Sequence, residues 1–127
     1  MITNQKFLTM SVSYIFHNGK KILYVDYTKC KSPKETLDVL ELVRKEYLKT
    51  NEMMLVVNDF RDAYASTEFM NKVSELGKQL FTQRTIKSAA VGVAGIKKIL
   101  VNAYNIFAEN KVTLFDTKEE ALDWVVK

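Results

Sequence analysis

Residues 8–16 alternate between apolar and polar side chains, a period of two that predicts a β-strand with one buried face. A second β-rich run covers residues 22–27. Asn18-Gly19 lies between the two runs, and a type I′ turn needs a positive φ at both of its central positions, which Asn and Gly adopt readily. The pattern therefore predicts an antiparallel hairpin at residues 8–27.

Further along the chain, short continuous apolar runs alternate with longer amphipathic segments. Residues 53–57, 86–93 and 112–115 are typical of strands covered on both faces. Between and after them, apolar residues recur every three or four positions, which predicts four helices. The predicted inner faces are Leu37, Leu40, Val43 or Arg44, Tyr47 and Leu48 in the first helix; Phe69, Val73, Leu76, Leu80 and Phe81 in the second; Ile96, Ile99, Leu100, Ala103 and Phe107 in the third; and Ala121, Leu122 and Val125 in the fourth.

Polar residues mark where these helices begin. Ser32-Pro33-Lys34-Glu35 combines a cap, a proline at the first helical position and a capping-box glutamate. Ser66 can cap the second helix, and Asp116-Thr117-Lys118-Glu119 repeats the capping-box pattern with Asp116 as the cap. The order β-β-α-β-α-β-α-β-α predicts an α/β fold in a single domain, residues 1–127. Its sheet is expected to be mixed and mostly parallel, opened by the hairpin, with about four helices.

Composition adds several exclusions. No charge-free stretch approaches the roughly 20 residues that span a bilayer, so we expect no integral membrane contact. The first residues lack the basic start and cleavage site of a secretion signal, and the only cysteine, Cys30, excludes an internal disulfide, so we expect a cytoplasmic protein. The net charge of +4 is spread among interspersed acids, a pattern that does not predict nucleic-acid binding.

The candidate site follows from the topology, because ligands of such folds bind beyond the C-terminal ends of the parallel strands. Those ends lead into residues 58–67, 92–98 and Asp116-Thr117, which together we call the rim. It contains carboxylates, a guanidinium, hydroxyls at a helix start where the dipole favours a negative group, glycines that allow close approach, and lysines in a first helical turn. The candidate residues, for an anionic ligand or as phosphoacceptors, are Asn58, Asp59, Arg61, Asp62, Ser66, Thr67, Gly92, Gly95, Lys97 and Lys98.

Two plainer interpretations of the rim remain open. In the first, Ser66 is an ordinary helix cap and the loop charges pair with each other. In the second, the two glycines form a tight strand-to-helix turn and the lysines are solvated. The glycine spacing does not match the phosphate-binding loops GxGxxG or GxxxxGK[ST], so the sequence gives little support for a nucleotide site.

Recognisable catalytic and metal chemistry is not predicted. His17 is the only histidine and lies at the hairpin turn, which excludes Ser-His-Asp and Cys-His arrangements. A structural zinc site needs several Cys or His ligands, and the spacing of Asp59, Asp62 and Asp116 matches no magnesium loop, so we expect no metal and no cofactor. An enzyme that uses Asp59 or Asp62 as a base is the remaining catalytic hypothesis, and it ranks last.

The chain resembles the SpoIIAA-like (STAS-type) family of small bacterial proteins, whose fold is also compared with CRAL-TRIO lipid carriers. The resemblance is carried by IKSAAVGVAGIKKILVNAYNIF at residues 86–107 and FDTKEEALDWV at residues 115–125. It implies a mixed sheet with helices. The anti-sigma antagonists of this superfamily carry a phosphorylated serine in an Asp-Ser-Ser-Gly motif. The matching positions, Ala65-Ser66-Thr67-Glu68, keep two hydroxyls but lack the Asp and the Gly.

Two functional hypotheses from different classes follow. The first is a non-enzymatic regulatory or binding module whose rim attracts an anionic small ligand or a protein partner. The alternative is a carrier or sensor of a lipid or other amphiphile, which needs a cavity between helices and sheet. The edge strand of the predicted hairpin could also pair two chains into a homodimer.

Overall fold

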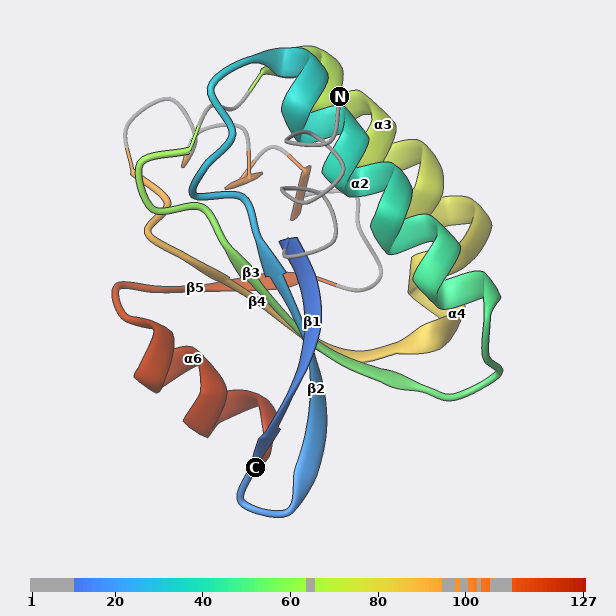
Figure 1. Ribbon diagram of the computed structural model, residues 1–127, viewed down its shortest axis with the longest axis vertical. Coiled ribbons are helices and arrows are strands. Elements are labelled where there is room, and N and C mark those ends of the chain that lie inside the picture. Colours follow the sequence, from blue (N-terminus) through green and yellow to red (C-terminus); the bar gives the residue numbers. More distant parts are fainter. Residues whose placement is uncertain (1–10, 64–65, 95–97, 99–100, 103, 106–110) are drawn as a thin grey trace.

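A five-stranded sheet forms the centre of the computed structural model, which describes residues 11–63, 66–94, 98, 101–102, 104–105 and 111–127 (Figure 1). The strand order is β1-β2-β3-β4-β5, with β1 antiparallel to β2 and all later neighbours parallel. The predicted mixed, mostly parallel sheet is therefore confirmed. The strands are β1 (Val12–His17), β2 (Lys20–Asp26), β3 (Met54–Asp59), β4 (Thr85–Val91) and β5 (Val112–Phe115).

The N-terminal hairpin forms where the sequence predicts it. Asn18 and Gly19 have φ values of +50° and +79°, both in the left-handed region that a type I′ turn requires. The register runs from Val12 opposite Val25 to His17 opposite Lys20. Phe16, next to the turn, has a side chain that is 72% exposed.

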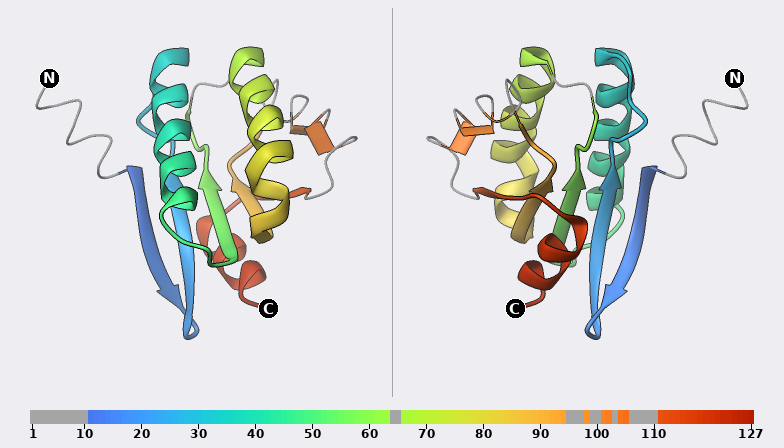
Figure 2. Two further views of the ribbon diagram at one scale, coloured as in Figure 1. Left: turned by 90° about the vertical axis from the view of Figure 1, so that its right-hand side faces the viewer. Right: turned by 90° about the vertical axis from the view of Figure 1, so that its left-hand side faces the viewer.

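Helices cover both faces of the sheet (Figure 2). α2 (Pro33–Leu48) and α3 (Thr67–Leu76) lie side by side on one face, and α3 continues through a π-helical turn, η1 (Gly77–Phe81), into the short α4 (Thr82–Arg84). α6 (Lys118–Val125) packs on the other face against β3 and β4. The third predicted helix, residues 96–107, lies mostly outside the described residues; the other three are confirmed. No described helix has both the length and the apolar content needed to cross a bilayer.

The helix starts follow the predicted cap chemistry, with one correction. Ser32 Oγ accepts a hydrogen bond from Glu35 N at 3.2 Å, and Ser66 Oγ accepts one from Phe69 N at 3.1 Å. The cap of α6 is Thr117, one residue beyond the predicted Asp116. Thr117 Oγ1 accepts from Glu120 N at 3.2 Å and donates to Glu120 Oε1 at 3.0 Å. A glutamate lies three positions after both Asp116 and Thr117, so the capping-box spacing alone does not distinguish them, and the hydrogen bonds identify Thr117 as the cap.

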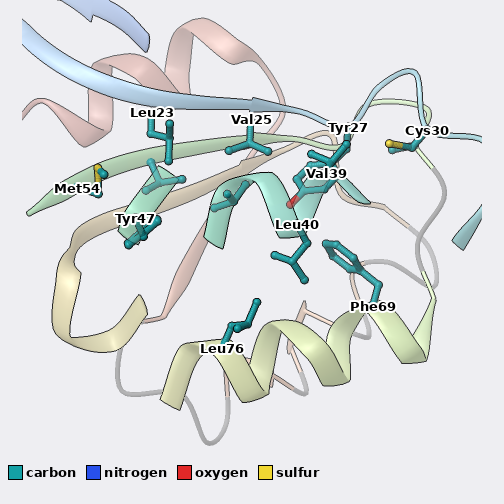
Figure 3. Close-up of a cluster of buried hydrophobic side chains, with 13 residues drawn as sticks. Leu23, Val25, Tyr27, Cys30, Val39, Leu40, Tyr47, Met54, Phe69 and Leu76 are labelled. Atoms are coloured by element: carbon teal, nitrogen blue, oxygen red, sulfur yellow. The ribbon is translucent and has the colours of Figure 1, made fainter. Parts of the chain in front are cut away.

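Alternate strand positions divide the core into two clusters. On the side of α2 and α3, Leu23 and Val25 meet helix residues such as Val39 and Phe69 (Figure 3). On the side of α6, Ile22 and Tyr24 join a smaller cluster. The predicted inner face of α2 needs correction, since Val39 is buried and Leu48 at the helix end is 59% exposed.

The C-terminal ends of the parallel strands lie in register along one edge of the sheet. Asp26 pairs with Asp59, Asp59 with Val91, and Val91 with Phe115. Backbone bonds continue the ladder beyond the strands, from Phe60 N to Val91 O at 2.9 Å and from Gly92 N to Phe115 O at 3.0 Å. Asn58 and Asp59 were expected in a loop, but they are the last two residues of β3. Their polar side chains are the reason that the sequence pattern predicted a loop there.

Candidate functional site

A buried carboxylate marks the C-terminal edge of the sheet. Asp59 ends β3, and its side chain is completely buried on the face covered by α6. Tyr24 on the neighbouring β2 donates its hydroxyl to Asp59 Oδ2 at 2.5 Å. Arg61 donates from Nε to Oδ1 at 3.0 Å and from Nη2 to Oδ2 at 2.6 Å, and its backbone N–H donates to Oδ1 at 3.2 Å. We call Tyr24, Asp59 and Arg61 the Asp59 cluster.

The cluster keeps Asp59 ionised. Burial alone would raise the pKa of Asp59, but the hydrogen bonds from Arg61 and Tyr24 outweigh burial and hold that pKa below its usual range. The same contacts raise the pKa of the Arg61 guanidinium. Burial and the hydrogen bond to Asp59 raise the pKa of Tyr24, so its hydroxyl remains a proton donor. A general base working near neutral pH needs a pKa close to 7, and Asp59 is shifted in the opposite direction.

The two members of the ion pair differ in exposure. The Asp59 side chain is 0% exposed, whereas the Arg61 side chain is 50% exposed. The buried carboxylate therefore fixes the position of the guanidinium, while part of the Arg61 side chain stays in contact with solvent. Lys118 at the start of α6 adds a second cation, because its Nζ lies 4.3 Å from the centroid of the Tyr24 ring.

Gly92, which directly follows β4, supports this arrangement. Its φ is +73°, and a Cβ at this position would lie only 2.9 Å from Arg61 Cα. A glycine is therefore required both by the backbone conformation and by the space that Arg61 occupies. The group that approaches Gly92 closely is thus part of the chain itself.

Four of the candidates at residues 58–67 lie outside the Asp59 cluster. Asn58 points to the opposite face, where its Nδ2 donates to Ala89 O at 3.2 Å and lies 3.4 Å from Ser88 Oγ. Asp62 is exposed, with a φ of +57° in the turn after Arg61. Ser66 acts as the cap of α3, and Thr67 is exposed at its first turn.

The second loop is described only in part. Gly92 and Lys98 are among the described residues, and Lys98 is exposed; Gly95 and Lys97 lie outside them. The structure thus brings together Asp59, Arg61 and Gly92 from the ten candidates, and the Asp59–Arg61 contact matches the interpretation in which loop charges pair with each other.

Sequence reasoning missed Tyr24 and Lys118. Tyr24 lies two positions before Asp26, the last residue of β2, so the two side chains point to the same face of the sheet. Asp26 pairs with Asp59 of β3, so strand alternation could have placed Tyr24 on the same face as Asp59. Its hydroxyl partner, however, depends on the parallel register of β2 with β3. Lys118 meets the Tyr24 ring only because α6 packs on this face of the sheet, which no local pattern in the sequence shows.

Other polar groups offer no further centre. Within the described part of the chain, no group of three or more His, Cys, Asp or Glu side chains could hold a metal ion. His17 pairs with Asp123 at 2.6 Å, joining the hairpin to α6. Cys30 is buried, and burial raises the pKa of its thiol to about 12, which keeps it protonated and unreactive.

Comparison with solved structures identifies the fold. The chain is similar to the crystal structure of an uncharacterized protein from the DUF3478 family with a SpoIIAA-like fold, from Shewanella loihica PV-4. The TM-score is 0.66 at 14% sequence identity, covering 90% of this chain and 91% of the other. Neither the family models nor the curated proteins contain a match to the sequence. The chain therefore has a SpoIIAA-like fold, as the resemblance implied.

Proposed function

We propose that this protein is a non-enzymatic binding module of STAS type that takes an anionic group of its partner at the rim. One observation carries the proposal: Arg61 is fixed by a buried carboxylate and still presents half of its side chain to solvent. A guanidinium held in this way loses little conformational entropy on binding, and its planar donors suit carboxylate or phosphate.

Two further features support an anionic partner at this edge. Lys118 adds positive charge next to the Asp59 cluster, and the start of α3 at Ser66 offers backbone N–H groups beside exposed Thr67. Phosphorylation of Ser66 or Thr67 remains a prediction from the family resemblance. A phosphate there would lie at a helix N-terminus, where it is stabilised.

The state of Asp59 supports a function without catalysis. Its carboxylate is ionised, buried and bound to three donor groups of Arg61 and to the Tyr24 hydroxyl. A base in this state would have to break its ion pair before it could accept a proton. The carrier alternative has less support, since the cavity between the sheet and α2 and α3 measures about 90 Å³, whereas pockets that enclose drug-sized ligands measure roughly 300–1,000 Å³.

A titration followed by NMR tests the proposal. Inorganic phosphate and pyrophosphate added to ¹⁵N-labelled protein should shift the amides of Arg61, Phe69 and Gly92 saturably. Arg61→Lys keeps the charge but loses the fork that Asp59 fixes, and it should weaken binding several-fold. Arg44→Gln removes a cation paired with Glu41 on α2 and should leave binding unchanged. Equal binding by wild type and Arg61→Lys would contradict the proposal.

The source of the anionic group needs a separate measurement. Immobilised wild type, Arg61→Lys and Arg44→Gln proteins can be compared in quantitative pull-downs from the source cells, before and after phosphatase treatment. A protein partner should be retained by wild type and Arg44→Gln and lost with Arg61→Lys. Binding of the phosphate probes without any such protein would assign the rim to a small anionic ligand. Homodimer formation through β1, an edge strand of the described sheet, remains a separate prediction.

A further inference from the structure

A cavity lies on the face of the sheet opposite to the Asp59 cluster. It measures about 90 Å³ and is enclosed by β3, β4, α2 and α3 together with Val101, Tyr104 and Val112. The cavity lies over β4, whose side chains that face it, Ser88 and Ala90, are both small. Central parallel strands usually carry Val, Ile or Leu at such positions, so the two small residues leave a hollow that the helices do not fill.

The walls of this cavity are apolar and largely aromatic. Tyr27 and Phe60 stack with their ring centroids 4.5 Å apart on one side. Tyr47 and Phe81 form a second aromatic pair, with centroids 4.8 Å apart, and Phe81 belongs to the π-helical turn that interrupts α3 and α4. Such turns are frequent at functional sites, because they displace a side chain from the regular helical face.

Two polar groups lie side by side in the floor. Asn58 Nδ2 donates to Ala89 O and lies near Ser88 Oγ. Among the described residues, none donates to Asn58 Oδ1 and none accepts from the Ser88 hydroxyl. The floor therefore offers one acceptor and one donor. In contrast, the hydroxyls of Tyr47 and Thr85 at the far end are bonded to each other at 2.5 Å.

We infer that this cavity binds a small neutral molecule with an apolar body and one group that both donates and accepts a hydrogen bond, such as a primary amide. None of the described residues that line it is charged, and an ion would lose its hydration there without a counter-charge. A cavity of about 150 Å³ holds benzene, so by proportion this one of about 90 Å³ takes about three or four non-hydrogen atoms. The inference does not depend on the Asp59 cluster, which lies on the other face of the sheet.

Two small probes of equal size test the site. Acetamide can accept from the Ser88 hydroxyl and donate to Asn58 Oδ1, whereas acetone can only accept. Both should shift the methyl signals of Met70 and Val73, which line the cavity, in a saturable way. Acetamide should bind about 2–10-fold more tightly, the ratio that corresponds to one net hydrogen bond. Absence of saturable shifts at these methyl groups, or equal affinities for the two probes, overturns the inference.

Variants locate the binding. Ala90→Val fills the hollow and should abolish the shifts. Ser88→Ala is nearly isosteric, so it should fold normally and weaken both probes a few-fold by removing the shared donor. Ser13→Ala removes an exposed hydroxyl from β1 and should change neither affinity. Undiminished binding in Ala90→Val, or in Ser88→Ala if the former does not fold, overturns the inference.

Discussion

The two faces of the sheet are built differently. The face under α2 and α3 has a large, aromatic-rich cluster and still contains a hollow over β4. The face under α6 has a smaller cluster and a single described helix, but it holds a fully buried carboxylate at its C-terminal edge. The face covered by α2 and α3, here called the thick cover, thus leaves space for a neutral molecule. The face covered by α6, here called the thin cover, allows the half-exposed Arg61 to pair with the buried charge of Asp59.

Asn58 and Asp59 show the difference within two consecutive residues. Asn58 faces the thick cover and is neutral, bonded to the main chain of β4. Asp59 faces the thin cover and is ionised, and it avoids the cost of an isolated buried charge because Arg61 folds back from the loop onto it. Substitutions on one face therefore have matched controls on the other.

The largest effect should come from removing Arg61. Arg61→Ala leaves the Asp59 carboxylate buried with only the Tyr24 hydroxyl, which should lower the free energy of unfolding by about 3–5 kcal/mol at neutral pH. Arg44→Ala, which breaks a partly exposed pair on the other face, should cost less than about 1 kcal/mol. Urea unfolding of the two variants measures the contrast, and similar losses would mean that the buried pair contributes little.

The same variant should change the pH dependence of stability. In the wild type the folded pKa of Asp59 lies below the unfolded value of about 3.9, so this contribution is present above that pH and is lost as the pH falls through and below it. Without Arg61, burial should raise the folded pKa above the unfolded value, so Arg61→Ala should regain stability relative to the wild type as the pH falls. Urea unfolding between pH 3 and pH 7 tests this expectation, and parallel profiles would contradict it.

Replacing Gly92 should have the next largest effect. Gly92→Ala places a Cβ against the Arg61 backbone and forces a non-glycine residue to adopt a φ of +73°. Gly19→Ala has a similar φ, +79°, but open space around the new Cβ. Gly19→Ala should cost about 1–2 kcal/mol for the backbone alone, and Gly92→Ala clearly more. Equal costs in thermal or urea unfolding would show that the contact with Arg61 relaxes freely.

Neighbouring alanines in β4 compare the two faces directly. Ala90 lines the hollow, whereas Ala89 packs in the cluster that contains Ala121 of α6. Ala90→Val should raise the free energy of unfolding by about 1 kcal/mol by filling empty space. Ala89→Val should lower it by about 1–3 kcal/mol through overpacking. Two losses of equal size would mean that both faces are packed equally well.

The smallest effect concerns the start of α6. Thr117→Ala should cost about 1 kcal/mol, because it removes the side chain that accepts from Glu120 N. Asp116→Ala should cost much less, since Asp116 is not the cap. Chemical unfolding distinguishes the two residues, and a reversed order would restore the cap originally expected from the sequence.

Local signals in the sequence were sufficient for most of the fold. Asn18-Gly19 predicted the hairpin because its turn depends on the two residues themselves, and Ser32 and Ser66 predicted helix starts for the same reason. Asp116 failed as a cap because Asp116 and Thr117 both suit that role and each has a glutamate three positions later, so the local pattern does not distinguish them.

The candidate site was harder to predict because it depends on contacts between strands. Asp59 and Arg61 were named, but their polarity suggested a loop, and nothing local shows that one is buried while the other is half exposed. Tyr24 meets Asp59 only through the register of β2 with β3. The hollow over β4 is visible in the small residues of TIKSAAV, but its size depends on how α2 and α3 are placed.

The position of α6 also affects how the chain is made. Ile22, Val57 and Ala89 belong to strands that precede α6 in sequence, and α6 is the described helix that shields them. During synthesis on the ribosome, this side of the sheet therefore stays uncovered until residues 118–125 have emerged. A nascent chain that pauses before that point displays an apolar surface on which chaperones can act and through which unfinished chains can associate.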